Sequence, residues 1–142
     1  MVKRLSILFL WLTALYFPTI SSAQILETAT WITETSANDV AIGDEIDLIF
    51  KATIDPDWYL YSSDFDPECG PIVASFSFAK NASYELVGEI QAINPEEKYD
   101  DIFECTVRIF KESCELRQTV KILAPDPVIQ GSYEYQTCSD ID

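Results

Sequence analysis

The sequence contains no histidine among its 142 residues. This absence excludes Ser-His-Asp and Cys-His catalysis, in which an imidazole accepts the proton of the nucleophile. It also argues against a zinc enzyme, because such sites normally use histidine ligands. Asp64, Asp66 and Glu68 alternate as calcium ligands do, but the stretch lacks the glycine and distal glutamate of an EF-hand and is interpreted as a solvated loop. We therefore expect neither a metal ion nor a cofactor.

Basic residues are scarce, with 9 Lys and Arg against 24 Asp and Glu and a formal charge of −15. A surface of this sign repels nucleic acid and anionic lipid. We therefore expect no nucleic-acid partner. The acidic charges could steer basic partners, but most of them are interpreted as serving solubility.

Long apolar runs are absent except at the start, in "MVKRLSILFLWLTALYFPTISSAQ". A basic pair, an apolar run and small residues at Ser21 and Ala23 are typical of a secretory signal peptide over residues 1–23. The apolar run is shorter than the roughly 20 residues that a membrane span requires. The sequence predicts a single exported domain over residues 24–142, periplasmic or otherwise exported, with no membrane association after cleavage.

Alternation of apolar and polar residues dominates the rest of the chain. In "DEIDLIFKATI" and "CELRQTVKI" the apolar residues fall on one face, which predicts strands with one buried side. Further strands are predicted at residues 28–33, 58–62, 72–79, 83–90, 103–110 and 132–137, between turn signals such as "DPDW" and "APDPVIQG". No segment has a helical stripe. The pattern predicts an all-β fold, an immunoglobulin-like antiparallel β-sandwich of about eight strands.

Four cysteines follow the leader, at positions 69, 105, 114 and 138. In an exported protein an even count indicates disulfides, and four cysteines allow three pairings. Cys105 and Cys114 flank a predicted hairpin. A tight turn at Lys111-Glu112 would place Cys105 opposite Gln118, which is too far from Cys114 for the roughly 7 Å limit of a disulfide. We therefore expect no bond between them.

The surroundings of the four cysteines predict two kinds of environment. Cys105 and Cys114 alternate with apolar neighbours and are expected to be small buried hydrophobes. Cys69 lies in a loop before Gly70, and Cys138 ends the last strand. These two are expected to be exposed thiols, and exposure is what redox exchange requires.

The segment "YEYQTCSD" resembles the active-site segment of the N-terminal domain of DsbD, the periplasmic thiol:disulfide interchange protein. That family has a Tyr-Gln-x-Cys-x-Asp run at the end of a strand, matched here by Tyr135, Gln136, Cys138 and Asp140. "WYLYSSDFDPECGPIVASFSF" and "EKYDDIFECTVRIF" are similar to two further family segments, in the same order. The resemblance covers nearly all of the chain after the leader and implies an immunoglobulin-like sandwich.

The resemblance also implies a chemistry. In the family, two cysteines with five residues between them cycle between dithiol and disulfide. A thioredoxin-like domain or protein reduces the pair, which then reduces oxidised exported proteins. The resemblance makes Cys138 the catalytic cysteine. The family's cap loop over the pair corresponds by position to Asp100, Asp101, Ile102 and Phe103. Phe103 is the candidate shield, unless its ring lies in the core. Asp100 and Asp101 could equally form a solvated turn.

The sequence departs from the family after Cys138. The family spacing would place the second cysteine at position 144, and the printed sequence ends at Asp142. Three interpretations remain open: a shortened version of a longer protein, a fold that has lost the redox chemistry, or recruitment of another thiol, with Cys69 as the candidate. The first two are favoured over recruitment. They correspond to two functions: an exchange domain impaired by loss of the second cysteine, or a non-catalytic exported β-sandwich that binds a protein partner.

Overall fold

The computed structural model describes residues 26–139, and the strand elements in this range confirm the all-β prediction. The signal peptide expected over residues 1–23 and the motif residue Asp140 lie outside the described residues. In the described range no helix has the length and apolar character of a membrane span. The strands are β1 (Ala29–Thr35), β2 (Glu45–Ile54), β3 (Trp58–Tyr61), β4 (Ser75–Phe78), β5 (Tyr84–Ala92), β6 (Glu96–Asp100), β7 (Cys105–Lys111), β8 (Ser113–Ile122), β9 (Gly131–Glu134) and β10 (Thr137–Ser139), with a short 3-10 helix η2 (Pro67–Cys69).

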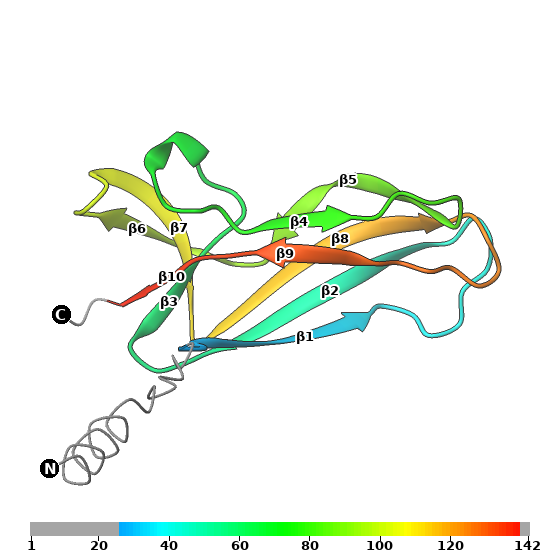
Figure 1. Ribbon diagram of the computed structural model, residues 1–142, viewed down its shortest axis with the longest axis horizontal. Helices are drawn as coiled ribbons and strands as arrows, with labels where there is room; N and C mark the ends of the chain where they lie inside the picture. The colour runs from blue at the N-terminus through cyan, green and yellow to red at the C-terminus, as the bar shows by residue number, and fades with distance from the viewer. Residues whose placement is uncertain (1–25, 140–142) are drawn as a thin grey trace, which may run out of the picture.

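The strands form three antiparallel sheets, which agrees with an immunoglobulin-like sandwich (Figure 1). One four-stranded sheet has the order β1-β2-β8-β5, and a second has the order β10-β3-β7-β6. Strands β4 and β9 make a two-stranded sheet, and β9 leads directly into β10. The second four-stranded sheet lies at the end of the molecule that holds β10, the last described strand (Figure 1).

The main hydrophobic core follows from the alternation in β2 and β8. The predicted apolar face of β2 is buried throughout, from Ile46 to Ile54. The matching face of β8 is also buried, and the second four-stranded sheet adds Leu60 and Phe110 from the opposite layer. Each fully buried Leu, Ile or Phe side chain contributes about 1.5 to 3 kcal/mol of transfer free energy, so this two-sided core is the main source of stability.

The predicted hairpin between β7 and β8 is wrong. β7 pairs with β3 and β6, whereas β8 pairs with β2 and β5, so the chain passes from one sheet to another at Glu112. Glu112 adopts the left-handed conformation with φ of 61°. Short turns alone do not make a hairpin when the two strands bury side chains in different layers. The expected absence of a Cys105–Cys114 bond is confirmed. The reason given for it, the register of a hairpin between β7 and β8, is wrong.

Strand β6 was not predicted, because "EEKYD" lies in a segment that was interpreted as a turn. It pairs with β7 from Glu96 opposite Ile109 to Asp100 opposite Cys105. Intrinsic propensity gives acidic residues little preference for strands, and pairing with a neighbouring strand overrides it. This unpredicted edge strand places Asp100 beside the candidate site.

Leu116→Ala tests the two-sided core. Leu116 is fully buried, so the substitution is expected to lower the free energy of unfolding by about 3 kcal/mol, from lost burial and the cavity left behind. Leu86→Ala makes the same chemical change at a side chain that is 47% exposed and should cost less than about 1 kcal/mol. Urea denaturation measures both. Equal losses would contradict the assignment of the core.

Candidate redox site

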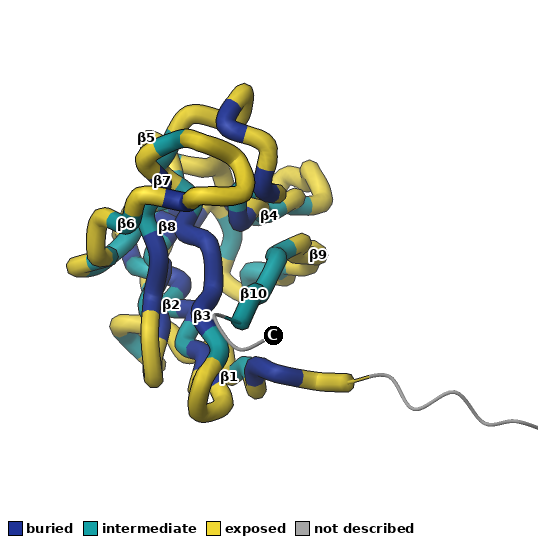
Figure 2. The backbone as a smooth tube through the Cα atoms, turned by 90° about the vertical axis from the view of Figure 1, so that its left-hand side faces the viewer, coloured by how far each residue is buried: buried dark blue, intermediate teal, exposed yellow. Residues whose placement is uncertain are grey.

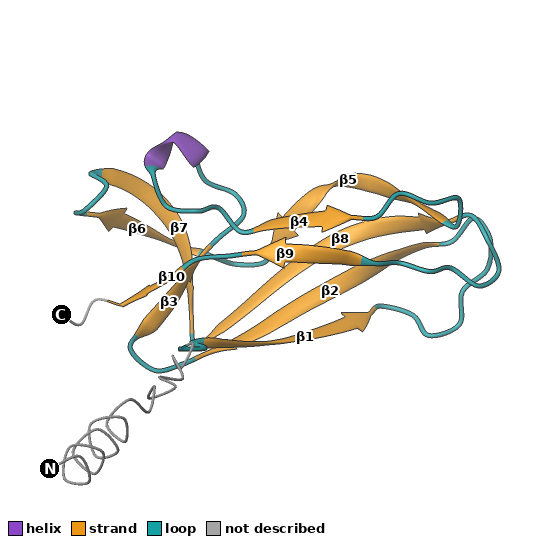
Figure 3. Ribbon diagram, in the orientation of Figure 1, coloured by secondary structure: helices purple, strands orange, loops and turns teal. Residues whose placement is uncertain are grey.

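The sheet β10-β3-β7-β6 carries a second, smaller apolar cluster on the face opposite to the main core. Residues directly opposite each other in an antiparallel pair share one face. The register places Cys138 opposite Tyr59 and Tyr61 opposite Ile109, whereas Leu60 faces the main core. Residues 62–70, including η2, lie over this end of the sheet (Figure 3). The cluster consists of Tyr59, Tyr61, Cys69, Val107 and Ile109, with Phe65, Cys105 and Cys138 packed against it.

Cys138 is a free, partly exposed thiol in the edge strand β10. It lies next to the Tyr59 hydroxyl: burial raises the pKa of Tyr59, and a hydrogen bond with Cys138 raises it further. Figure 2 shows the buried backbone of β3 beside the half-buried β10. Cys138 therefore combines access from solvent with a defined polar neighbour.

A chain of hydrogen bonds leads from Tyr59 to the loop after β6. The Tyr59 and Tyr61 hydroxyl oxygens are 3.4 Å apart, and the Tyr61 hydroxyl donates to Oδ2 of Asp100 at 2.6 Å. The other oxygen of Asp100 accepts from the backbone N–H groups of Ile102 and Phe103, at 3.0 and 3.2 Å. One carboxylate thus holds both the tyrosine pair and the start of the loop.

Asp100 is 2% exposed, so the solvated turn considered for it is wrong. Burial by itself raises the pKa of Asp100, but the hydrogen bonds from Tyr61, Phe103 and Ile102 and the charge of Lys98 outweigh burial, and the net pKa is lowered. Burial and the bond to Asp100 raise the pKa of Tyr61 well above its usual value. Lys98 Nζ lies 4.5 Å from the centroid of the Tyr59 ring and 3.5 Å from its hydroxyl.

The remaining residues of the predicted cap loop are at the surface. Asp101 and Ile102 are exposed, with Ile102 at 78%. The ring of Phe103 lies against Gly70, where it leaves no room for a Cβ, and Gly70 has a φ of 113°. Phe103 is 37% exposed and does not belong to the main core. The loop is linked to Cys138 through Asp100 and the two tyrosines.

The structure contains a disulfide between Cys69 and Cys105, with Cα atoms 5.8 Å apart. This bond corrects two expectations: Cys69 is not an exposed thiol, being 8% exposed, and Cys105 is not a free buried thiol. The segment with η2 folds over the sheet and brings Cys69 to the first residue of β7. Alternation along the chain could not reveal this contact, because it joins residues 36 positions apart.

The disulfide is well separated from Cys138. Tyr59, which faces Cys138, also faces Lys111, and Cys105 lies at the opposite end of β7. At about 3.3 Å per residue this places Cys105 about 20 Å along the strand. The structure therefore does not bring Cys69 to Cys138 as a resolving thiol. Cys114 lies in the other sheet and is buried, as predicted.

Two other residues of the predicted motif, Tyr135 and Gln136, directly precede β10 and hold this segment in place. The Gln136 side chain accepts from the Ile72 N–H at 2.7 Å, and its backbone carbonyl accepts from the Tyr61 N–H at 3.1 Å. The Tyr135 ring packs 5.2 Å from Trp31. The segment before β10 is thus attached to β3 by a backbone hydrogen bond, and to β1 and the Ile72 loop by its side chains.

The family model described as "Thiol:disulfide interchange protein DsbD, N-terminal" matches residues 28–141. No curated protein and no solved structure matches the chain.

Asp100→Asn tests the buried carboxylate. Because the pKa of Asp100 is lowered on folding, its charge stabilises the native state above the unfolded pKa of about 4, and that contribution is lost as the pH falls through the folded pKa. At pH 7 the variant should lose about 1 to 3 kcal/mol of stability. The loss should shrink in acid.

Thermal or urea unfolding across this pH range measures the Asp100 effect. The matched control is Asp101→Asn at the adjacent exposed carboxylate, which should change stability little at any pH. A pH-independent loss in Asp100→Asn would show that its charge contributes nothing.

The four sulfurs should react very differently with iodoacetamide in the native protein. Cys138 should be labelled first, since it is partly exposed. Burial raises the pKa of Cys114 to about 12, so its thiol should stay unlabelled until unfolding. Cys69 and Cys105 should label only after reduction. Peptide mass mapping reads each site, and comparable labelling of Cys114 and Cys138 would contradict the site assignment.

Proposed function

Since the chain belongs to the family of the N-terminal domain of the thiol:disulfide interchange protein DsbD, we propose that Cys138 is its exchanging thiol. Membership implies thiol:disulfide interchange, redox partners and export. The finer proposal is a periplasmic domain that passes reducing equivalents from a thioredoxin-like partner to oxidised exported proteins. The observation that carries it is the free, partly exposed Cys138 on an edge strand, beside the Tyr59 hydroxyl.

The exchange step follows from the chemistry of thiolates. Cys138 loses its proton, and its sulfur attacks one sulfur of a substrate disulfide. The substrate S–S bond breaks, its second sulfur leaves as a thiolate, and a mixed disulfide with Cys138 forms. A second thiol must attack that mixed disulfide to release reduced substrate and complete the transfer of two electrons. Cys69 and Cys105 are joined to each other in the structure and do not supply it.

The neighbours of Cys138 have positioning roles in this proposal. The Tyr59 hydroxyl is placed to donate to the sulfur, and Lys98 adds a positive charge beside that hydroxyl. Tyr61 and Asp100 restrict the hydroxyl from the other side through hydrogen bonds. The loop over residues 101–104, with Phe103, is the proposed cap over this end of the sheet, as in the family.

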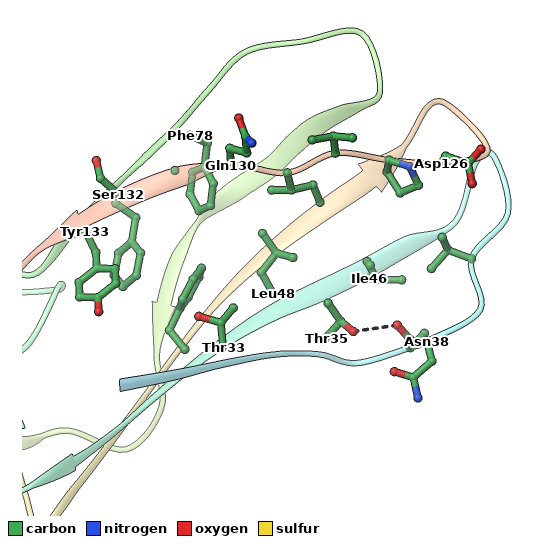
Figure 4. A pocket seen from close by; sticks show the side chains of 18 of the residues that line it. Thr33, Thr35, Asn38, Ile46, Leu48, Phe78, Asp126, Gln130, Ser132 and Tyr133 are labelled. Atoms are coloured by element: carbon green, nitrogen blue, oxygen red, sulfur yellow. Dashed lines mark hydrogen bonds between the residues drawn. The ribbon is translucent and has the colours of Figure 1, made fainter. Parts of the chain in front are cut away.

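A non-catalytic binding module is the second candidate, favoured by a groove of about 860 Å³ (Figure 4). The inner faces of β2 and β4 line it with Leu48, Phe50, Phe76 and Phe78, and Tyr133 of β9 lies at its side. Within residues 26–139, the edge of β9 that faces away from β4 has no strand partner. A partner strand with alternating apolar side chains would pair with that edge and fill the groove.

Exchange by Cys138 can be tested with residues 24–142 and a thioredoxin-like protein that keeps one active-site cysteine, joined to 2-nitro-5-thiobenzoate. Attack by Cys138 should release the coloured thiol and leave one covalent adduct per chain, without further turnover. Cys138→Ser should form no adduct. Cys114→Ser, which replaces the buried free thiol, should react like the parent protein.

Each alternative outcome has a specific meaning. Failure of Cys138 to react while the fold is intact would favour the binding module. Multiple turnovers with a disulfide substrate and a reduced partner would contradict the single-thiol chemistry. If Cys69→Ser then abolished that turnover, Cys69 would be the resolving thiol after all.

A further inference from the structure

The segment from residue 62 to residue 70, here called the strap, packs over one end of the sheet that carries the candidate site, beside the start of β7. It joins β3 to the approach of β4 and contains η2 (Figure 3). The Phe65 ring packs 6.1 Å from the Tyr61 ring. Tyr61 in turn contacts Tyr59, the neighbour of Cys138. The strap therefore packs directly on Tyr61 and reaches Tyr59 and Cys138 only through it.

The strap is attached to the sheet by one covalent bond and a few polar contacts. The bond is the Cys69–Cys105 disulfide at its distal end. Asp64 forms an ion pair with Arg108, and the Ser62 N–H donates to the Arg108 carbonyl at 2.8 Å. Partly exposed ion pairs stabilise little, and a 3-10 helix of three residues has little stability of its own. The disulfide is thus the strongest attachment of the distal strap.

The same disulfide lies at the base of the loop over residues 101–104. Asp100 directly precedes that loop and pairs with Cys105, which directly follows it. Cys69 is followed by Gly70, against which the Phe103 ring packs. Both segments that cover this end of the sheet therefore meet at one bond. The bond is also reachable, because Cys105 is only partly buried, in contrast to Cys69.

We propose that Cys69–Cys105 is a second redox site of the domain, which a dithiol reductant of the thioredoxin class opens, and that its opening frees the strap from the face that carries Cys138. A reductant thiolate attacks the Cys105 sulfur, the S–S bond breaks, and Cys69 leaves as a thiolate that takes up a proton. The second thiol of the reductant then attacks the mixed disulfide, which releases Cys105 as a thiol and leaves the reductant oxidised. Two electrons and two protons are transferred.

The structure accommodates the reduced form. The Cys69 sulfur lies 3.7 Å from the Thr106 carbonyl oxygen, so the released thiol has an acceptor at hand. With the bond open, the distal strap and Phe103 lose their common anchor, while the main core on the other face keeps all its contacts. Reduction then changes access to the Tyr61–Tyr59–Cys138 side of the sheet without unfolding the sandwich. This coupling does not require Cys138 to turn over catalytically.

The first experiment asks whether the bond opens in the native protein. Residues 24–142 are treated with dithiothreitol or with a reduced thioredoxin-like protein, and then alkylated at neutral pH with excess iodoacetamide for mass mapping. Labels should appear on Cys69 and Cys105 without denaturant, while Cys114 stays unlabelled. Label on the pair only after a denaturant is added would overturn the proposal, since the bond would then be a closed structural link.

The second experiment measures whether reduction exposes Cys138 and loosens the strap. After removal of the reductant under anaerobic conditions, a short pulse of alkylating reagent should label Cys138 about tenfold faster in the reduced than in the oxidised protein, because local opening exposes its neighbours. Hydrogen exchange should rise in residues 62–70 and stay unchanged in β2 and β8. Equal Cys138 rates and equal exchange of the strap in both forms would overturn the coupling.

Matched variants separate the disulfide from general effects of reduction. The double variant Cys69→Ser and Cys105→Ser should label Cys138 rapidly with or without reductant. Cys114→Ser keeps the disulfide and should retain the dependence on reduction. If the double variant does not fold, reduced parent protein with unchanged exchange in β8 serves in its place. A double variant that still labels slowly would overturn the proposal.

Discussion

Strand β3 is the constraint on which the rest of this structure depends, because its four residues serve two cores at once. Leu60 is fully buried in the main core, and Tyr59 and Tyr61 are buried in the cluster on the opposite face. β3 pairs with β10 on one side and with β7 on the other. Removal of β3 from this position would separate Cys138 from its polar neighbours and open the sandwich at one end.

Two buried tyrosine hydroxyls require hydrogen-bond partners, and the bonds that they form position the residues of the candidate site. A buried hydroxyl without a partner costs free energy, and buried polar groups in native proteins are therefore nearly always paired. The Tyr61 hydroxyl donates to Asp100, and Asp100 also accepts from backbone N–H groups of the following loop. The loop that the family resemblance assigns as a cap is thus fixed by the same carboxylate that fixes the tyrosines.

The free thiol and the disulfide on this side of the molecule have different physical characters. Cys138 is a free thiol on an edge strand, whereas Cys69–Cys105 closes a loop between residues 36 positions apart. Closing a loop of this length reduces the entropy of the unfolded chain and stabilises the fold by about 4 kcal/mol in the chain-entropy description. The bond therefore combines a substantial structural contribution with one partly exposed cysteine, Cys105.

The sequence by itself determined the all-β class, the buried faces of β2 and β8, and the family, since alternation and local motifs are encoded in neighbouring residues. Only the tertiary structure decided that β7 and β8 belong to different sheets, that the acidic "EEKYD" is a strand, and that Cys69 meets Cys105. Asp100 shows the reason most clearly. Its neighbours in sequence suggest a solvated turn, and its role comes from Tyr61, 39 positions away. Contacts between distant segments depend on how the sheets stack, and no local pattern records that.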